Sequence, residues 1–289
     1  MLRGAQSVDD TGPDVNRVIR APGKLVLLGE YAVLDGVPAV VAAIDHGVVC
    51  TVHAGQGIRT PGDDTFVCEA LLGAPPALYE FDDWNPVLGI GGKPGFGGSA
   101  AATVAACLAA GRSGMDAFDV HAKVQGGGSG IDVAASLWGG VRRYQLGQRV
   151  AGSGMDLPAF SVIWSGQSSR TAPRVHQYLA WPGRAAFCAR MQQIVDRYEA
   201  DPVEAIADGY DLLCAMSREA GIEYDLTAFQ RIDEIAATYG GAAKPSGAGG
   251  GDIAVAVFAS DEDRRGFEVV CAADGLVVIP TQVCLVGAG

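Results

Sequence analysis

Apolar residues in the first half of the chain follow a β-strand pattern. The first stretch, 18–28, is interrupted at 21–23 by Ala-Pro-Gly, which predicts a turn. Two valine-rich stretches follow at 38–44 and 48–52, and valine favours strands. Mixed signals in 58–85, with several Pro and Gly residues, predict loops. The N-terminal half is therefore predicted to open as a sheet.

Helical patterns begin after a glycine-rich loop. The alanine-rich segment 99–110 predicts a helix, and the Ser99 hydroxyl stands where it could cap the first free N–H groups. Further along, apolar residues recur at helical spacing in 185–198 and 203–220. Strands are predicted for 160–164, for the end of 244–258 and for 275–286.

Composition narrows the functional classes. At 289 residues the chain can hold two modest domains, and no stretch approaches the ~18 apolar residues of a transmembrane helix. The first residues lack a secretory apolar core, so a cytoplasmic location is expected. The seven cysteines form no CxxC pair, which argues against a disulfide framework or a zinc site. A formal net charge of −12 argues against nucleic acid and anionic membranes as partners.

An anionic small molecule would need cations at chosen places, and few lysines are present. Of 21 basic residues four are lysines. Lys24, Lys93 and Lys244 lie in glycine-rich or turn segments, and Lys123 precedes another. We interpret them as compact ammonium groups placed at phosphate-contacting sites. The alternative is an arginine-biased composition in which a few lysines remain by accident.

Glycine makes up 41 of the 289 residues and gathers in clusters, each of which alone is a weak signal. The segment 95–100 satisfies the G-x-G-x-x-A dinucleotide fingerprint, but that motif needs a buried strand before it, and Gly-Gly-Lys-Pro precedes it here. The sequence G-x-x-x-x-G-K-[ST] of the nucleotide P-loop is absent. A glycine loop that leads into a helix still offers N–H groups and a positive dipole end to an anion.

Three glycine clusters in one order are a specific combination. The segments APGKLVLLGEYAVL (21–34), KPGFGGSAA (93–101) and KPSGAGGGD (244–252) resemble the three signature motifs of the GHMP kinases. The resemblance covers about residues 18–286. It implies ATP-dependent phosphorylation of a small anionic molecule, with ATP and Mg²⁺ as cofactors.

The same resemblance implies the fold class. We expect an α+β fold with a GHMP ATP-binding domain over 1–160 and a C-terminal GHMP domain over 161–289. The active site would lie in the cleft between them, and the protein would be a monomer or a homodimer.

The second motif implies how ATP is bound. Backbone N–H groups would wrap the phosphates, Lys93 would add charge, and Ser99 would bind Mg²⁺. The family's usual Gly-Leu-Gly-Ser-Ser is here Gly-Phe-Gly-Gly-Ser, so Ser99 either serves alone or only caps the helix. The ATP-binding candidates are Lys93, Gly95, Phe96, Gly97, Gly98, Ser99 and Ala100.

Two residues match the family's catalytic positions. Asp132, in GSGIDVAAS, matches the catalytic aspartate, and Lys24 matches the lysine that faces it. They would orient the attacking oxygen and neutralise charge in transit. The structural alternatives are a first-turn carboxylate and a lysine that points into water. Analogy gives further substrate-binding candidates, for which ordinary turn and strand roles are the alternative: Tyr31, Ser129, Gly130, Ser246 and Gly247.

Three features resemble the phosphomevalonate kinase subfamily. The first is QGGGSGIDVAAS with its following WGG, together with KPSGAGGGD, and the second is WSGQSSRT (164–171), which resembles a substrate-adjacent segment. The third is His121, eleven positions before Asp132, where mevalonate kinases place a metal-binding Glu. The expected acceptor is 5-phosphomevalonate. The alternatives are an alcohol such as mevalonate or a sugar, and a catalytically silent ligand sensor.

Some features depart from the family or stay outside it. The stretch 111–120 is short for the family, so a helix there is expected to be trimmed, and no second metal ligand is identified. No recognisable motif surrounds the other histidines, which are interpreted as structural or surface residues: His46, His53 and His176.

Overall fold

The computed structural model describes residues 16–289 except 88, 149, 153, 170 and 225. The N-terminal half is built on a sheet with the strand order β3-β4-β2-β5-β6, in which β1 also pairs with β2. The strands of this sheet are β1 (Val18–Leu28), β2 (Ala39–His53), β3 (Gly57–Arg59), β4 (Leu78–Trp84), β5 (Val141–Tyr144) and β6 (Gly154–Met155). A 3₁₀ helix, η1 (Ala32–Asp35), follows β1.

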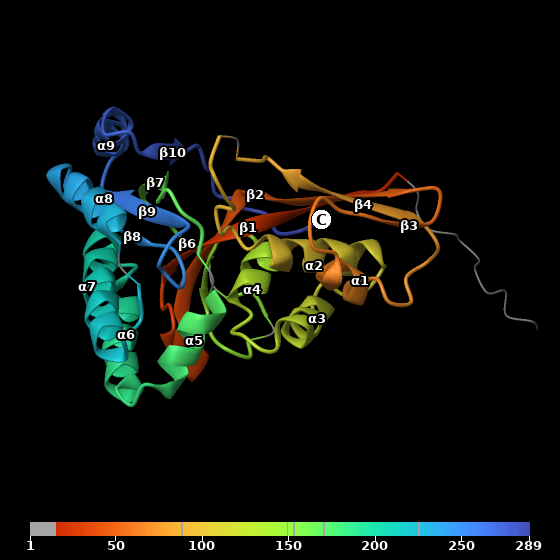
Figure 1. The fold of residues 1–289 in the computed structure, drawn as a ribbon, viewed down its shortest axis with the longest axis horizontal. Helices are drawn as coiled ribbons and strands as arrows, with labels where there is room; N and C mark the ends of the chain where they lie inside the picture. The colour runs from red at the N-terminus through yellow and green to blue at the C-terminus, as the bar shows by residue number, and fades with distance from the viewer. Residues whose placement is uncertain (1–15, 88, 149, 153, 170, 225) are drawn as a thin grey trace, which may run out of the picture.

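Helices pack on one face of this sheet, below it in Figure 1. They are α1 (Thr65–Ala70), α2 (Gly98–Ala109), α3 (Asp116–Gln125) and α4 (Ile131–Trp138). The alanine-rich face of α2 lets the helix approach β1 and β2 closely, and Ala101 and Ala105 are fully buried there. The helix predicted at 99–110 is confirmed.

The C-terminal half has its own antiparallel sheet, in the order β10-β7-β9-β8, with helices packed against it (Figure 1). Its strands are β7 (Ala159–Trp164), β8 (Ala242–Pro245), β9 (Ile253–Phe258) and β10 (Val277–Ile279). Its helices are α5 (Thr171–Ala180), α6 (Arg184–Arg197), α7 (Pro202–Ala220), α8 (Thr227–Thr238) and α9 (Asp261–Ala273). Helices α6 and α7 confirm the periodicity seen in the sequence. The two sheets part between β6 and β7, near the expected boundary at residue 160.

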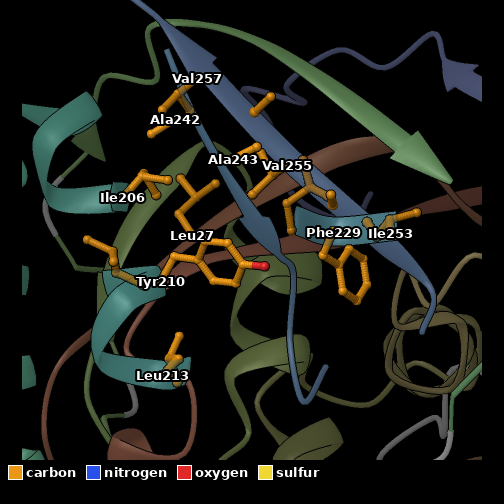
Figure 2. Close-up of a cluster of buried hydrophobic side chains, with 14 of the residues drawn as sticks. Leu27, Ile206, Tyr210, Leu213, Phe229, Ala242, Ala243, Ile253, Val255 and Val257 are labelled. Carbon is orange, nitrogen blue, oxygen red and sulfur yellow. The ribbon is translucent and has the colours of Figure 1, made fainter. Parts of the chain in front are cut away.

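The long helix α7 has clear start and stop signals. The Asp201 carboxylate accepts a hydrogen bond from Glu204 N (3.0 Å), Pro202 occupies the first turn, and Gly221 ends the helix with φ 68°. Its apolar face meets the sheet in the core shown in Figure 2, where Tyr210 and Leu213 lie near strands β8 and β9.

Strand β1 is shared by two hydrophobic cores. Its Leu25 and Leu27 belong to the core of the C-terminal half. Its Ile19 and Val26 belong to the core between the N-terminal sheet and helices α2 and α4. Alternate side chains of a strand point to opposite faces, so one strand can serve both cores. Lys24 lies on this strand, between the two cores.

One sequence prediction about the first strand is wrong. Residues 21–23 do not form a turn but a register shift between Pro22 and Gly23 within one strand, β1. A side chain at Gly23 would overlap the His46 carbonyl, which explains the glycine. The strand patterns at 38–44 and 48–52 are confirmed, and the two stretches belong to the single strand β2.

Other boundaries also differ from the predictions. The segment 58–85, predicted as loops, contains α1 and β4, and 111–120 leads into a ten-residue helix, α3. The strand predicted at 275–286 is limited to β10. The last residues return to the N-terminal half instead, where Cys284 N donates to Ala43 O (2.9 Å) and Gly289 N donates to Arg20 O (3.1 Å) (Figure 1). Of the helices in the described part of the chain, none has the length and apolar character needed to cross a bilayer.

Candidate active site

The glycine loops of the second and third motifs meet at Lys24, which the first motif contributes from β1. The second glycine loop (residues 91–98) precedes α2, and the third glycine loop (residues 246–251) follows β8. A methyl group placed on Gly97 would lie 3.0 Å from Lys24 Cγ and 3.6 Å from Asp132 Cβ. One placed on Gly247 would lie 3.8 Å from Lys24 Nζ. The fold thus gathers Lys24, Asp132, Gly97 and Gly247 around one point.

Lys24 is held tightly on β1. Its side chain is buried, with 7% of the residue exposed, and Nζ donates a hydrogen bond to Gly95 O (3.0 Å). Its backbone N donates to Phe96 O (2.9 Å), which joins β1 to the second glycine loop. A neutral carbonyl satisfies the ammonium without cancelling its charge. The arrangement excludes the alternative of a lysine that points into water.

Asp132 is placed by the start of α4. Gly130 precedes the helix with φ 76°, and an added Cβ would lie 3.0 Å from Phe118 Cδ1 and 3.0 Å from Tyr144 Oη. Ser129 supports the same turn, since its Oγ accepts from Ile131 N (3.3 Å) and its carbonyl accepts from Tyr144 Oη (2.5 Å). The carboxylate of Asp132 therefore lies in a first helical turn, where negative charge is stabilised.

The second glycine loop combines an anchored and an open part. Gly95 and Gly97 both have φ 77°, a left-handed conformation that favours glycine. Between them Phe96 is buried and stacks on His46, with ring centroids 4.9 Å apart. Lys93, Gly98 and Ser99 are exposed. The structural interpretation of His46 thus holds, and its ring supports the loop.

The prediction that Ser99 caps α2 is wrong. The helix begins at Gly98, its cap residue is Gly97, and no side chain caps it. Ser99 Oγ lies instead 3.3 Å from His121 Nε2. The Ala100 amide, predicted to contact phosphate, donates to Gly97 O (3.0 Å) within the helix start.

His121 lies inside the candidate site although it belongs to α3. The ring is buried and stacks on Phe66 at 5.0 Å. Burial lowers the pKa of His121, and the negative charge of Asp132 opposes that shift. The His121 side chain is therefore a neutral ring beside Ser99. A glutamate, which the resemblance gives for mevalonate kinases at this position, would place a negative charge there.

The third glycine loop is fastened along β1. Ser246 Oγ accepts from Val26 N (2.9 Å), and Tyr31 Oη donates to Ala248 O (2.6 Å). Both side chains are buried, and burial raises the pKa of Tyr31. In this structure the two hydroxyls hold the loop, and Gly247 is the part of the loop that faces Lys24.

The interpretation of every lysine as a phosphate contact is wrong for two of them. Lys244 is fully buried, donates to Pro245 O (2.8 Å) and forms an ion pair with Glu30. Lys123 pairs with Glu69 on the surface (2.6 Å). Glu30 was missed by sequence reasoning because its partner is 214 positions away. Asp252, the last residue of the third motif, was also missed as a contact of the second glycine loop.

Oxygen donors for a metal are few in this region. Within the residues that the structure describes, no group of three or more His, Cys, Asp or Glu side chains is arranged to hold a metal ion. Mg²⁺ in phosphoryl-transfer sites commonly takes one or two protein oxygens together with substrate phosphates and water. The exposed Ser99 hydroxyl at the start of α2 fits such a limited role.

Some known proteins have a similar sequence. No family model matches the chain. A phosphomevalonate kinase from Streptomyces sp. (strain CL190) is 28% identical, in an alignment that covers 86% of this chain and 91% of the relative. A second phosphomevalonate kinase, from Saccharolobus solfataricus, is 32% identical over 43% of this chain and 47% of its own length.

Solved structures give the fold. The phosphomevalonate kinase of Streptococcus pneumoniae, in complex with phosphomevalonate and AMPPNP, has a TM-score of 0.74 at 17% identity and covers 92% of this chain and 99% of its own. The L. major mevalonate kinase in complex with R-mevalonate has a TM-score of 0.73 at 19% identity, with 96% and 98% covered. The two scores are nearly equal, so the fold does not select an acceptor. The chain has the fold of the GHMP kinases, and over most of its length its sequence is similar to that of a phosphomevalonate kinase.

Proposed function

We propose that this chain transfers the γ-phosphoryl group of ATP to 5-phosphomevalonate. A phosphate oxygen of the acceptor attacks the γ-phosphorus, the bond from that phosphorus to the β–γ bridging oxygen breaks, and 5-diphosphomevalonate and ADP result. The observation that supports this most is the meeting of Lys24, Asp132 and Gly97 at one point, in a chain whose sequence resembles phosphomevalonate kinases.

The acceptor enters already charged, and this sets the roles of the two side chains. The second pKa of a phosphate monoester is about 6, so near pH 7.5 the attacking oxygen is ionised and needs no strong base. Asp132 then orients the acceptor and the lysine. The buried Lys24 ammonium neutralises charge as the phosphoryl group moves.

The nucleotide would be held by the second glycine loop and the start of α2. The residues proposed for ATP are Lys93, Gly95, Phe96, Gly97, Gly98, Ser99 and Ala100, of which Phe96 supports the loop from its buried side. Mg²⁺, bound through Ser99, would supply a positive charge that draws electron density from the donor phosphates. For the acceptor we keep Ser129, Gly130 and Gly247, with Tyr31 and Ser246 as supports of the loop.

The acceptor can be tested directly. We expect a coupled ADP-release assay to show kcat/KM at least ~100-fold higher for 5-phosphomevalonate than for mevalonate, about 2.7 kcal/mol of discrimination. Equal or greater activity on mevalonate or a sugar would contradict the proposal that 5-phosphomevalonate is the acceptor. Absence of ADP release with every acceptor tested, in a folded protein, would favour the catalytically silent ligand sensor.

Two substitutions test the mechanism. If an alcohol were the acceptor, Asp132 would be a general base, and Asp132→Asn should cost roughly 10²–10⁴-fold in kcat. With a phosphate acceptor, Lys24→Met should be at least as damaging as Asp132→Asn. Lys123→Met is the matched control, because it removes a surface lysine from the same half of the chain. A far more severe defect in Asp132→Asn would contradict charge positioning by Lys24.

The domains 1–160 and 161–289 are proposed as the nucleotide-binding and C-terminal domains. The cytoplasmic location and the monomeric or dimeric state stay predictions.

A further inference from the structure

Asp252 has a left-handed backbone conformation, which is uncommon for residues other than glycine. It ends the third motif, directly before β9, with φ 63°. A non-glycine residue in this left-handed region is strained, and such strain persists where the surroundings fix the residue. Its contacts explain what fixes it.

Three hydrogen bonds tie Asp252 to the segment after β7. Asp252 N donates to Gln167 O (2.7 Å), and Ser165 N donates to Asp252 O (2.9 Å). The carboxylate itself accepts from Ser169 N at Oδ1 (3.0 Å). Segment 165–169 and the end of the third motif therefore form one unit within the C-terminal half.

The carboxylate of Asp252 rests against the second glycine loop. A methyl group on Gly95 would lie 2.5 Å from Oδ2 and 2.7 Å from Cγ of Asp252, so only glycine allows this approach. The carbonyl of the same Gly95 accepts the hydrogen bond from Lys24 Nζ. Burial raises the pKa of Asp252, and the charges of Lys24 and Arg174 oppose that shift, in keeping with a carboxylate close to the ammonium. Asp252 thus touches the residue that holds Lys24.

Ser168 forms hydrogen bonds with the second glycine loop near its start, at Lys93. Its Oγ accepts from Lys93 N (3.0 Å) and donates to Lys93 O (3.1 Å). The proposed nucleotide loop is therefore held at Lys93 and at Gly95 by side chains that belong to the C-terminal half.

We propose that Asp252 is a positioning residue: it seats the second glycine loop at Gly95 and so places the Lys24 ammonium between donor and acceptor phosphates. The inference rests on the proposed function. The third glycine loop ends at Asp252, so an acceptor that orders this loop also orders the nucleotide loop. Binding of nucleotide and of acceptor should then favour each other, and the effect must be reciprocal.

Calorimetry can measure this coupling. AMPPNP is titrated into the full chain with and without saturating 5-phosphomevalonate, and in the wild type we expect the acceptor to lower the nucleotide Kd at least fivefold. Asp252→Gly removes the carboxylate while glycine keeps the backbone conformation without strain. It should reduce the coupling to less than twofold and lower kcat at least tenfold.

Asp252→Asn is the conservative partner, because asparagine keeps the size, an acceptor oxygen for Ser169 N and a tolerance of positive φ. It should retain the coupling to within about twofold of the wild-type value, and thus above that of Asp252→Gly. Ser168→Ala should weaken the coupling, whereas Ser165→Ala should not, because the Ser165 hydroxyl donates only within its own segment, to Gln167 O (3.0 Å).

Wild-type coupling in Asp252→Gly would overturn the proposal, and so would an Asp252→Asn protein that behaves like Asp252→Gly. Equal losses of melting temperature and of nucleotide binding in both variants would indicate a merely structural role and would overturn it as well. If the wild type binds no AMPPNP, the proposed function fails. If it binds both ligands and turns over without coupling, only the inference about Asp252 fails.

Discussion

The buried ion pair between Glu30 and Lys244 gives the sharpest prediction about stability. Lys244 is fully buried, 4% of Glu30 is exposed, and the pair joins the first motif to the third. Burial lowers the pKa of Lys244, and the carboxylate of Glu30 opposes that shift. Among the described residues Glu30 Oε2 has no hydrogen-bond partner, so the carboxylate depends on this lysine. Lys244→Met keeps most of the volume and removes the charge.

The expected loss follows from what the substitution leaves behind. An uncompensated buried charge costs roughly 3–5 kcal/mol, mostly through desolvation. At about 2–4 °C per kcal/mol for a chain of this size, the apparent Tm should fall by roughly 6–20 °C. Replacing both partners, in Glu30→Met/Lys244→Met, leaves no buried charge and should recover stability to within about 1 kcal/mol of the wild type.

Urea unfolding followed by tryptophan fluorescence measures these differences. Lys123→Met is the control, because Lys123 is 68% exposed and its pair with Glu69 should contribute no more than about 1 kcal/mol. A cost below about 1 kcal/mol for Lys244→Met would refute the argument that the lysine compensates a buried carboxylate. A double variant as unstable as the sum of its single variants would refute the proposed interaction.

The remaining predictions concern the nucleotide. Gly97→Val places a branched side chain at positive φ next to Lys24 Cγ, so calorimetry should show an ATP Kd raised at least tenfold, about 1.4 kcal/mol, in a protein whose melting confirms folding. An unchanged Kd would contradict the assignment of this loop to ATP. Ser99→Ala should leave the melting temperature nearly unchanged, because Ser99 is not the helix cap, while its kcat defect should deepen as free Mg²⁺ is lowered. A defect independent of Mg²⁺ would remove Ser99 from the metal site.

Sequence reasoning succeeded where chemistry is local. Helix α2 follows from its alanine content and α7 from its periodicity. The motif resemblance singled out Lys24 and Asp132, which the fold places near Gly97, and their catalytic roles stay proposals. Of the two roles considered for Ser99, the structure excludes only the helix cap, although the hydroxyl is one position from the helix start. Gly97 adopts a positive φ and takes the cap position, which shifts the helix start to Gly98.

Distant contacts could not be predicted. The return of residues 282–289 to β1 and β2 depends on backbone hydrogen bonds, which almost any residue type could make and which therefore leave no pattern in the sequence. The turn predicted at 21–23 became a bulge because β2 runs the whole length of β1 and holds the strand together on both sides of it. For the same reason Asp252 carries no sequence signal of its contact with Gly95, which lies in another motif.

The acidic character of the chain and its proposed anionic ligands are compatible because the relevant charge is local. Exposed charges are largely screened beyond a Debye length, about 8 Å at physiological ionic strength, so most of the net charge of −12 has little effect inside the site. Lys24 is buried, so solvent and salt screen its charge less. Its hydrogen bond to the Gly95 carbonyl leaves that charge available to a phosphate, because the carbonyl is neutral. Lys244 is buried too, but Glu30 neutralises it, and its contribution is to hold the third glycine loop in place. Lys24 thus contributes positive charge to the site, whereas Lys244 contributes to the structure of the third glycine loop. For this reason only Lys24 is expected to act on the phosphoryl group.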